Sequence, residues 1–230
     1  MKRVVVFSGA GISAESGIKT FRDSGGLWEE YAIEDVATPQ AWNRNPELVL
    51  DFYNKRRVQV IQAQPNPAHY ALAELEKAFE VIVITQNIDD LHERAGSSKV
   101  VHLHGEILKA RSTKDPELIY QLDKQEILIG DTCELGSQLR PHIVWFGEAV
   151  PAMDEAISLT QTADIFIVIG TSLEVYPAAG LIMYAPDHAI KILVDPQATL
   201  PFGSGEFSVV RNTAGVGVKS VVDKLLSQHV

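Results

Sequence analysis

The chain begins with an apolar run that leads directly into a loop of small residues. Residues 4–7 read Val-Val-Val-Phe, and residues 8–11 read Ser-Gly-Ala-Gly. A continuous apolar run is typical of a strand buried on both faces, as in a parallel sheet. Small residues after such a strand let backbone amides approach a pyrophosphate, and a following helix N-terminus favours its charge. The start of the chain therefore predicts a dinucleotide site.

Further apolar runs of strand length alternate with helical patterns along the chain. These runs lie at 81–84, 100–103, 165–169 and 190–194. Pro46 and Pro67 suit the first turns of two intervening helices, and residues 153–162 and 216–226 also follow a helical period. Strands that alternate with helices predict an α/β fold, a Rossmann-like parallel sheet with helices on both faces.

The stretch between the first two predicted strands is too long for an ordinary Rossmann unit. Such a unit closes within about 30 residues and carries an acidic residue about 20 residues after the glycines. Here residues 15–79 intervene, and a second insertion at 109–140 is polar and has no strong period. We therefore expect one domain over residues 1–230, with the two insertions packed together as a small lobe, and a dinucleotide held in an unusual way.

Composition limits the class of protein and its partners. The 230 residues carry a formal net charge of −10, which argues against a nucleic-acid-binding face and fits either basic protein substrates or simple solubility. No apolar run is long enough to span a bilayer, and the first is too short for a signal peptide, so we expect a cytoplasmic protein. Cys133 is the only cysteine, which excludes an intrachain disulfide and a cysteine-based zinc site.

Polar side chains follow the second predicted strand, where residues 85–90 read Thr-Gln-Asn-Ile-Asp-Asp. In open α/β sheets, ligands bind beyond the carboxyl ends of the strands, near the point where strand order reverses. Asn87 and Asp89 are suited to hold ribose hydroxyls or a carboxamide there. The alternative is that one of them caps a helix that begins near Leu91.

Two histidines lie at the end of the third predicted strand. His102 and His104 share a face because strand side chains alternate, and His104 lies nearer the ligand edge, next to Gly105. Histidine is the side chain best suited to accept a proton at neutral pH, so His104 is a candidate general base. A pair of hydrogen-bonded core histidines is one alternative. A His-x-His metal site is another, although the spacing suggests no third ligand.

Three further segments have two interpretations each. Residues 170–172, Gly-Thr-Ser, suit contact with a ribose or a phosphate, or form an ordinary turn. Residues 141–148 suit pairing with a substrate backbone by strand addition, or form a buried aromatic cluster. Tyr53 and Arg56 share a helix face and suit a carboxylate ligand, or form a solvated surface pair.

Taken together, these segments resemble the sirtuins, a family of NAD-dependent protein-lysine deacylases. The matching motifs are Gly9-Ala10-Gly11-Ile12-Ser13, Gly17-Ile18, Phe21-Arg22, Thr85-Gln86-Asn87-Ile88-Asp89, His104-Gly105, Phe146-Gly147-Glu148 and Gly170-Thr171-Ser172. Several independent motifs in the right order make the resemblance specific, and it covers most of the chain. The segments similar to the bacterial desuccinylase/deacetylase branch are Leu27-Trp28, Ala37-Thr38-Pro39, and Phe52-Tyr53 with Arg56.

The resemblance implies a role for each matching position. His104 would be the general base, with Asn87 and Asp89 at the nicotinamide ribose and carboxamide. The other implied cofactor contacts are Gly9, Ala10, Gly11, Ile12, Glu15, Thr20, Phe21, Arg22, Trp28, Gln86, Ile88, Gly170, Thr171, Ser172, Asp195, Pro196, Gln197 and Ala214. The implied substrate contacts are Tyr53, Arg56, Ala37, Val144, Phe146, Gly147 and Glu148.

The resemblance also implies a reaction that consumes NAD. The carbonyl oxygen of an acyl-lysine displaces nicotinamide from the ribose, and water then completes the transfer, releasing lysine and O-acyl-ADP-ribose. Tyr53 and Arg56 would bind the carboxylate of succinyl- or malonyl-lysine, and Ala37 would leave room for it. Asp195 replaces the usual Asn, which favours NAD over NADP by repelling a 2′-phosphate. Most sirtuins carry two Cys-x-x-Cys pairs where this chain has only Cys133, so we expect no zinc.

Two other functions fit the same motifs. One is a module that binds NAD or ADP-ribose without turnover, and the other is an ADP-ribosyl transferase or NAD glycohydrolase that shares the first step. The partners we expect are acylated proteins or peptides, with no nucleic acid and no membrane. The sequence does not indicate the oligomeric state, and a monomer is compatible with it.

Overall fold

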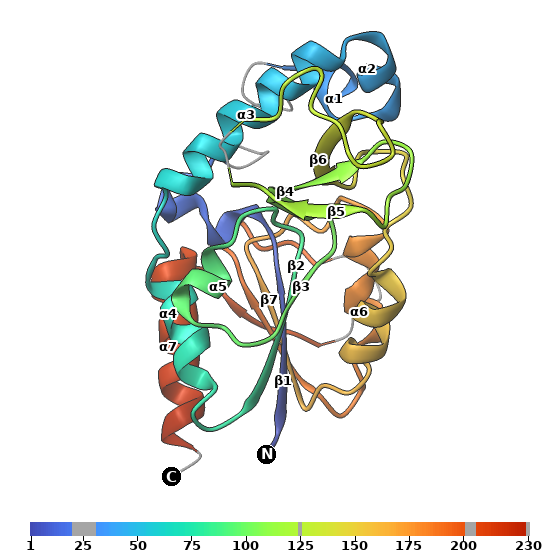
Figure 1. Ribbon diagram of the computed structural model, residues 1–230. Helices are drawn as coiled ribbons and strands as arrows, with labels where there is room; N and C mark the ends of the chain where they lie inside the picture. Colours follow the sequence, from blue (N-terminus) through green and yellow to red (C-terminus); the bar gives the residue numbers. More distant parts are fainter. Residues whose placement is uncertain (20–30, 124–125, 201–205, 229–230) are drawn as a thin grey trace.

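A parallel sheet forms the centre of the larger lobe (Figure 1). The computed structural model describes residues 1–19, 31–123, 126–200 and 206–228. Within these ranges six strands lie in the order β3 (Val100–His102), β2 (Glu80–Thr85), β1 (Arg3–Ser8), β7 (Ile165–Ile169), β8 (Ile190–Val194) and β9 (Ser208–Val210). Neighbouring strands in this order are all parallel, which confirms the predicted fold class.

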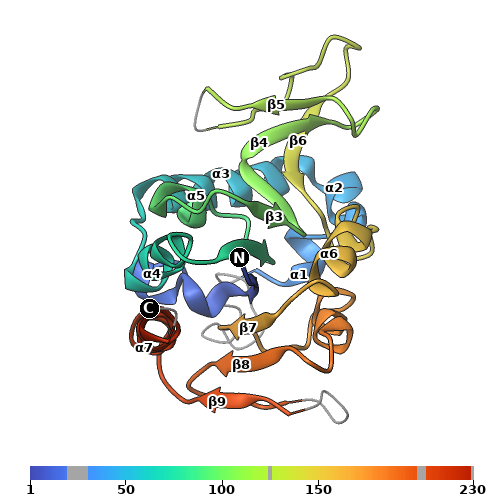
Figure 2. The ribbon, with the colours of Figure 1, turned by 90° about the horizontal axis from the view of Figure 1, so that it is seen from below.

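Helices cover both faces of this sheet (Figure 2). One face packs on α4 (Pro67–Leu75) and α7 (Ala214–Ser227), and the other on α6 (Met153–Thr160) and the 3₁₀ helix η3 (Ala178–Tyr184). Alternate residues of β1 face the two layers: Val4 packs with α4 and α7, and Val5 packs with α6 and η3. Because both faces are buried, each central strand is a continuous apolar run.

The strand order reverses between β1 and β7. From β1 the chain builds outward through β2 to β3, whereas β7, β8 and β9 extend the sheet on the other side of β1. The loop after β1 forms two short 3₁₀ helices, η1 (Ala10–Ile12) and η2 (Ala14–Ser16), and the loop after β2 leads into α5 (Leu91–Ala95). These loops therefore lie where open α/β sheets bind their ligands.

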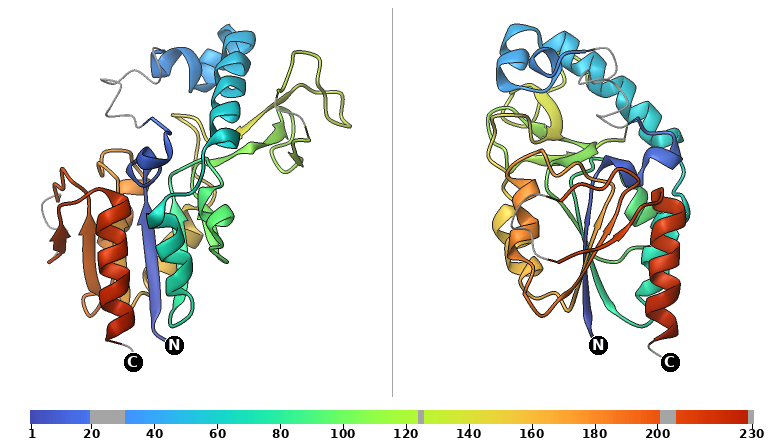
Figure 3. Two further views of the ribbon diagram at one scale, coloured as in Figure 1. Left: turned by 90° about the vertical axis from the view of Figure 1, so that its left-hand side faces the viewer. Right: turned by 180° about the vertical axis from the view of Figure 1, so that it is seen from behind.

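The smaller lobe stands beyond the carboxyl ends of the parallel strands (Figures 1 and 3). Its helices are α1 (Ile33–Val36), α2 (Pro39–Arg44) and α3 (Pro46–Gln62). In the described part of the chain, its antiparallel sheet has three strands in the order β5 (Ile119–Gln121), β4 (Gly105–Ser112) and β6 (Leu139–Ile143). Phe52 of α3 packs in one apolar cluster with Ile107 of β4 and Ile143 of β6. Residues 33–62 and 105–143 thus share a core.

Two buried polar side chains of α3 bind the backbone of this second segment. Asn54 Nδ2 donates to Ile127 O (3.0 Å), and Asn54 Oδ1 accepts from Ile127 N (2.9 Å). Arg57 donates from Nε to Ile107 O and from Nη1 to Asn54 Oδ1, both at 2.7 Å. Burial lowers the pKa of Arg57 to about 10, so the guanidinium is still charged at neutral pH. The Asn54 side chain thus makes with Ile127 the two backbone hydrogen bonds that a neighbouring strand would otherwise make.

Cys133 lies in a hydrogen-bonded group with two serines. Its Sγ is 3.3 Å from Ser112 Oγ and 3.2 Å from Ser137 Oγ, and the two hydroxyl oxygens are 2.9 Å apart. These contacts lower the pKa of Cys133 to about 7. Over the described ranges, no three His, Cys, Asp or Glu side chains gather in a group suited to a metal ion. Nor does any helix in those ranges have the length and apolarity needed to cross a membrane.

Candidate active site

The loops after β1 and β7 interlock through glycines. Gly9 N donates to Ile169 O (3.0 Å), and Gly11 N donates to Gly170 O (2.8 Å). Gly170 has a φ of 58°, and a Cβ placed on it would lie 2.5 Å from Ile12 N. The glycines are therefore required by the close approach of the two loops. The backbone amides of Gly9 and Gly11 are thus donated within the chain.

A buried cluster joins the loops after β1 and β2. Asn87 Nδ2 donates to Ser13 Oγ (3.1 Å), and Ser13 Oγ donates to Asp89 Oδ2 (3.0 Å). Asp89 Oδ1 also accepts from Leu91 N (3.1 Å), the first residue of α5, but the N-cap of that helix is Asp90, and it has no side-chain cap hydrogen bond. All three side chains of the cluster are buried, and burial raises the pKa of Asp89 against the hydrogen bonds that lower it. The sequence prediction named Ser13 as part of a matching motif but gave it no role in the site.

The two histidines at the end of β3, His102 and His104, have different surroundings. His104 Nδ1 lies 3.1 Å from Gln86 O, and burial lowers the pKa of this imidazole. A neutral ring that donates from Nδ1 to this carbonyl keeps Nε2 as a proton acceptor. His102 has contacts at both nitrogens, from Nδ1 to Asn87 O (3.0 Å) and from Nε2 to Glu93 Oε1 (2.7 Å). The hydrogen-bonded core interpretation thus describes His102, and His104 keeps the geometry of a base.

Behind the Asn87 loop lies a second buried polar group, which the sequence prediction did not include. Thr85 Oγ1 accepts hydrogen bonds from Ser8 Oγ (2.9 Å) and from Asn87 N (3.0 Å). His92 Nε2 contacts Ser8 Oγ at 3.0 Å. Burial holds the pKa of His92 well below its usual value, so this ring is neutral. The backbone of the loop is therefore anchored at the ends of β1 and β2.

Tyr53 and Arg56 lie on the side of α3 that faces the core of the small lobe. Both side chains are buried, Tyr53 fully and Arg56 to 5% exposure, so the solvated-pair interpretation is wrong. Tyr53 packs in the same cluster as Ala37 and Trp145, and the Arg56 guanidinium lies 5.8 Å from the centre of the Phe52 ring. Burial raises the pKa of Tyr53, although the nearby Arg56 charge and a hydrogen bond with Trp145 oppose the shift. The phenol is therefore neutral.

Residues 144–146 run beside the site with their amides already in use. The donors and acceptors are Val144 N to His104 O (2.9 Å), Trp145 N to Glu148 Oε2 (2.8 Å) and Phe146 N to Ala37 O (3.0 Å). A substrate backbone therefore cannot add as a strand by accepting hydrogen bonds from these three amides. Trp145 is buried and stacks obliquely on Trp42 at 5.7 Å, as the aromatic-cluster interpretation predicted, whereas Phe146 is exposed.

Glu148 holds the turn that follows. Its carboxylate pairs with Arg140 Nη1 (2.7 Å) and Arg111 Nη2 (3.1 Å), and Gly147 has a φ of 90°. The Arg140 guanidinium also lies 3.2 Å from the centre of the Trp145 ring. Burial raises the pKa of Glu148, but the hydrogen bonds and charges of the arginines outweigh it, and the pKa is lowered overall. Glu148 therefore shapes the segment rather than presenting a free carboxylate.

The positions assigned to the adenosine half lie at the ends of β7 and β8. Thr171 Oγ1 accepts from Gln86 Nε2 (2.9 Å), which joins this loop to the loop after β2. Asp195 is buried, and its Oδ1 accepts from Gln197 N (2.7 Å). Ser172 is half-buried, and Pro196 and Gln197 are exposed.

Other predicted contacts have structural partners. Glu15 Oε2 accepts from Gly215 N (2.6 Å) and Oε1 from Thr213 Oγ1 (3.2 Å), so its carboxylate caps α7, which begins at Ala214. Ala10 and Ile12 lie in η1, and Ile12 is buried in the core of the large lobe. Ile88 O accepts from Ile107 N (2.9 Å). Thr20, Phe21, Arg22 and Trp28 lie outside the described residues.

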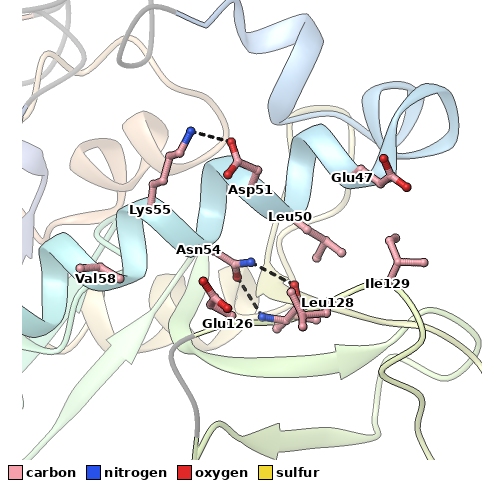
Figure 4. A pocket seen from close by; sticks show the side chains of 10 residues that line it. Glu47, Leu50, Asp51, Asn54, Lys55, Val58, Glu126, Leu128 and Ile129 are labelled. Carbon is pink, nitrogen blue, oxygen red and sulfur yellow. Dashed lines mark hydrogen bonds and ion pairs between the residues drawn. The ribbon is translucent and has the colours of Figure 1, made fainter.

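A pocket of about 370 Å³ opens elsewhere, between α3 and residues 126–129 (Figure 4). Its walls include Leu50, Asn54 and Leu128, and its rim carries an exposed ion pair between Lys55 and Asp51 (2.7 Å). None of the predicted site residues lines it. The pocket is therefore separate from the polar groups at the strand ends.

Comparison with known proteins places this architecture in a family. The model of the Sir2 family matches residues 9–177. The chain belongs to the Sir2 family. A Helicobacter pylori protein named NAD-dependent protein deacylase is 54% identical over 226 residues, 98% of each chain, and a Bacteroides thetaiotaomicron protein of the same name is 52% identical over 98% of this chain and 99% of its own. A Sir2 homologue solved as an NAD complex is 41% identical, with a TM-score of 0.90 over 100% of this chain and 91% of its own.

Proposed function

We propose that this Sir2 chain is an NAD-dependent protein-lysine deacylase. The observation that carries the proposal is the juxtaposition at the strand-order reversal: the Ser13–Asn87–Asp89 cluster, and a neutral His104 that keeps Nε2 as a proton acceptor. The names of the Helicobacter pylori and Bacteroides relatives, and the similar NAD complex, support it.

The donor set at this site fits a nicotinamide riboside. Asn87 offers an amide and Asp89 a carboxylate acceptor, both fixed by Ser13, and the same loop carries the Gln86 carbonyl that orients His104. Bound NAD supplies a ribose carbon from which nicotinamide can leave when an acyl-lysine carbonyl oxygen attacks. His104 Nε2 then takes a proton from a ribose hydroxyl, whose oxygen attacks the acyl carbon. Addition of water and cleavage of the bond between that carbon and the lysine nitrogen would release lysine and leave the acyl group on the ribose. Asp195 at the adenosine end would disfavour a 2′-phosphate.

We also propose that acidic acyl groups are substrates. A buried guanidinium at Arg56 beside the neutral phenol of Tyr53 suits a carboxylate, because both groups donate hydrogen bonds. Ala37, one of the alanines in that cluster, is consistent with space for a succinyl or malonyl chain. Acetyl-lysine would use the same reaction without this contact.

The small lobe is proposed to need no zinc. The chain has one cysteine, and its thiol is hydrogen-bonded to Ser112 and Ser137. Asn54 and Arg57 instead bind backbone groups of the second segment from α3. Ordinary hydrogen bonds and packing thus support the lobe.

The test is a panel of acetyl-, succinyl- and malonyl-lysine peptides with NAD, read by product mass. His104→Ala should abolish formation of O-acyl-ADP-ribose. Arg56→Met should spare deacetylation and lower desuccinylation by roughly 10- to 100-fold, the cost of a charged hydrogen bond. Arg44→Met, on an exposed arginine of α2, is the matched control. Free ADP-ribose or ADP-ribosylated protein as the main product would contradict the proposal, and so would equal loss of both activities in Arg56→Met.

A further inference from the structure

The two contacts of His102 define its protonation state. Nδ1 lies 3.0 Å from Asn87 O, and Nε2 lies 2.7 Å from Glu93 Oε1. A carbonyl oxygen and an ionised carboxylate only accept hydrogen bonds, so each contact needs a hydrogen on the ring. A neutral imidazole has one such hydrogen and can satisfy only one of the two partners. The geometry therefore describes an imidazolium ion, paired with Glu93 and 8% exposed at its side chain.

This imidazolium and His104 bind consecutive carbonyls of one loop. His104 contacts the carbonyl of Gln86, and His102 contacts that of Asn87. The backbone N–H of Asn87 donates to Thr85 Oγ1, and its side-chain Nδ2 donates to Ser13 Oγ. His102 thus supplies the anchor on the carbonyl side of Asn87, the residue that the proposed function places at the nicotinamide ribose.

We propose that His102 is a positioning residue, an imidazolium clamp that Glu93 orients and that fixes the loop from Gln86 to Asp89 against His104. This inference rests on the proposed function for the reaction that it serves. His102 makes no contact with the reacting atoms in this scheme. It acts through the carbonyl of Asn87.

The charged groups around His102 come from three elements. Glu93 and His92 lie on α5, Asp89 follows β2, and Glu106 lies on β4. Burial lowers the pKa of His102, but the hydrogen bond and charge of Glu93 outweigh it, with smaller help from Asn87 O and Glu106, so the pKa is raised overall. The pKa of Glu93 is lowered overall, which keeps it a carboxylate.

A clamp of this kind fails at alkaline pH. When His102 loses a proton, its remaining hydrogen goes to the charged Glu93 partner, and the Asn87 carbonyl is released. His104 needs the opposite condition, because it must be neutral to act as a base, and burial lowers its pKa. Activity should therefore rise with pH as His104 deprotonates and fall again as His102 does.

Three variants of the full chain separate the clamp from a merely structural role. His102→Asn keeps a donor near the Nδ1 position and should retain kcat/KM within about 3-fold, whereas His102→Leu removes both contacts and should lose roughly 10-fold or more. In Glu93→Gln the amide can donate to Nε2 of a neutral ring, whose Nδ1 hydrogen stays on Asn87 O. This variant should keep its activity at neutral pH and lose the alkaline decline.

The readouts are kcat, KM for NAD and the pH profile of deacetylation, with Glu74→Gln on the exposed side of α4 as the control. Circular dichroism and urea unfolding show whether His102→Leu is folded. If His102→Leu is unfolded, the kcat/KM of His102→Asn and the pH profile of Glu93→Gln test the proposal instead. The proposal is overturned if His102→Asn is as impaired as the folded leucine variant, or if Glu93→Gln keeps the alkaline decline of the wild type.

A readout without turnover separates this proposal from the proposed function. The ring ¹⁵N shifts of His102, followed by NMR, should show an imidazolium at neutral pH in the wild type and a neutral ring in Glu93→Gln. A neutral His102 in the wild type overturns the clamp even if the protein is an active deacylase. If no acyl peptide is turned over, the proposed function fails, and the NMR titration still decides the state of His102.

Discussion

Asn54 should be a main support of the small lobe, and its replacement measures how strongly the two segments are joined. Asn54→Ala removes three hydrogen bonds, two to the backbone of Ile127 and one from Arg57. Ile127 is fully buried, so its N–H and C=O lose their partners without gaining water. At about 1 kcal/mol for each bond, less about 0.6 kcal/mol for the better helix propensity of alanine, the free energy of unfolding should fall by about 2–3 kcal/mol.

Two further variants, Asn54→Asp and Lys55→Ala, should lose less stability than Asn54→Ala and so provide a scale for the effect. In Asn54→Asp the introduced carboxylate would still accept from Ile127 N and from Arg57 but cannot donate to Ile127 O, so a loss of about 1 kcal/mol is expected. Lys55 is exposed and, among the described residues, forms an ion pair with Asp51 on the same helix, so its removal should change the free energy of unfolding only slightly.

Urea unfolding followed by tryptophan fluorescence is a suitable assay, because Trp42 and Trp145 lie in the small lobe. Amide exchange at Ile127 should accelerate in Asn54→Ala well before the parallel sheet opens. The reasoning is refuted if Asn54→Ala costs no more than Lys55→Ala, since the hydrogen bonds to Ile127 would then carry no net stability.

Two further predictions concern the interlocked loops and the absence of zinc. Gly170→Ala would place a Cβ 2.5 Å from Ile12 N at a φ of 58°, so we expect about 2–5 kcal/mol of destabilisation and lost NAD affinity. Gly17→Ala, at a φ of 87° but with open space around it, should cost only the conformational part, about 1–2 kcal/mol; equal costs in calorimetry would refute the steric argument. For zinc, the purified protein should contain less than about one-tenth of a zinc equivalent by elemental analysis, and EDTA should leave its Tm unchanged. Stoichiometric zinc, or a lowered Tm, would contradict this.

The parallel sheet could be predicted because its strands are buried on both faces. The apolar run at 165–169 coincides with β7, and the run at 4–7 lies inside β1. The small sheet could not be predicted in the same way. Strands β4 and β6 alternate only weakly between buried and half-buried residues, and β5 has no buried residue. Residues of β4 and β6 share a core with α3, which lies far away in sequence.

The site was predictable in position but not in detail. His102 and His104 have the same side chain, face and strand end, and they are distinguished by Glu93 on α5, a contact that spacing does not reveal. The burial of Tyr53 likewise depends on packing against the second segment of the small lobe. The glycine loop was assigned to the correct edge, but its partner in close approach is Gly170, which lies in the loop after β7, far along the chain.

The interlock of Gly11 with Gly170 also constrains how this protein can change over generations. Each glycine fills space that a methyl group on the other would need, so a larger residue at either position requires a compensating backbone shift in the opposite loop. Homologous chains that lose one of these glycines should therefore have altered the other loop as well, in length or in path. The ends of β1 and β7 would then be inherited as a unit, although they are far apart in the sequence.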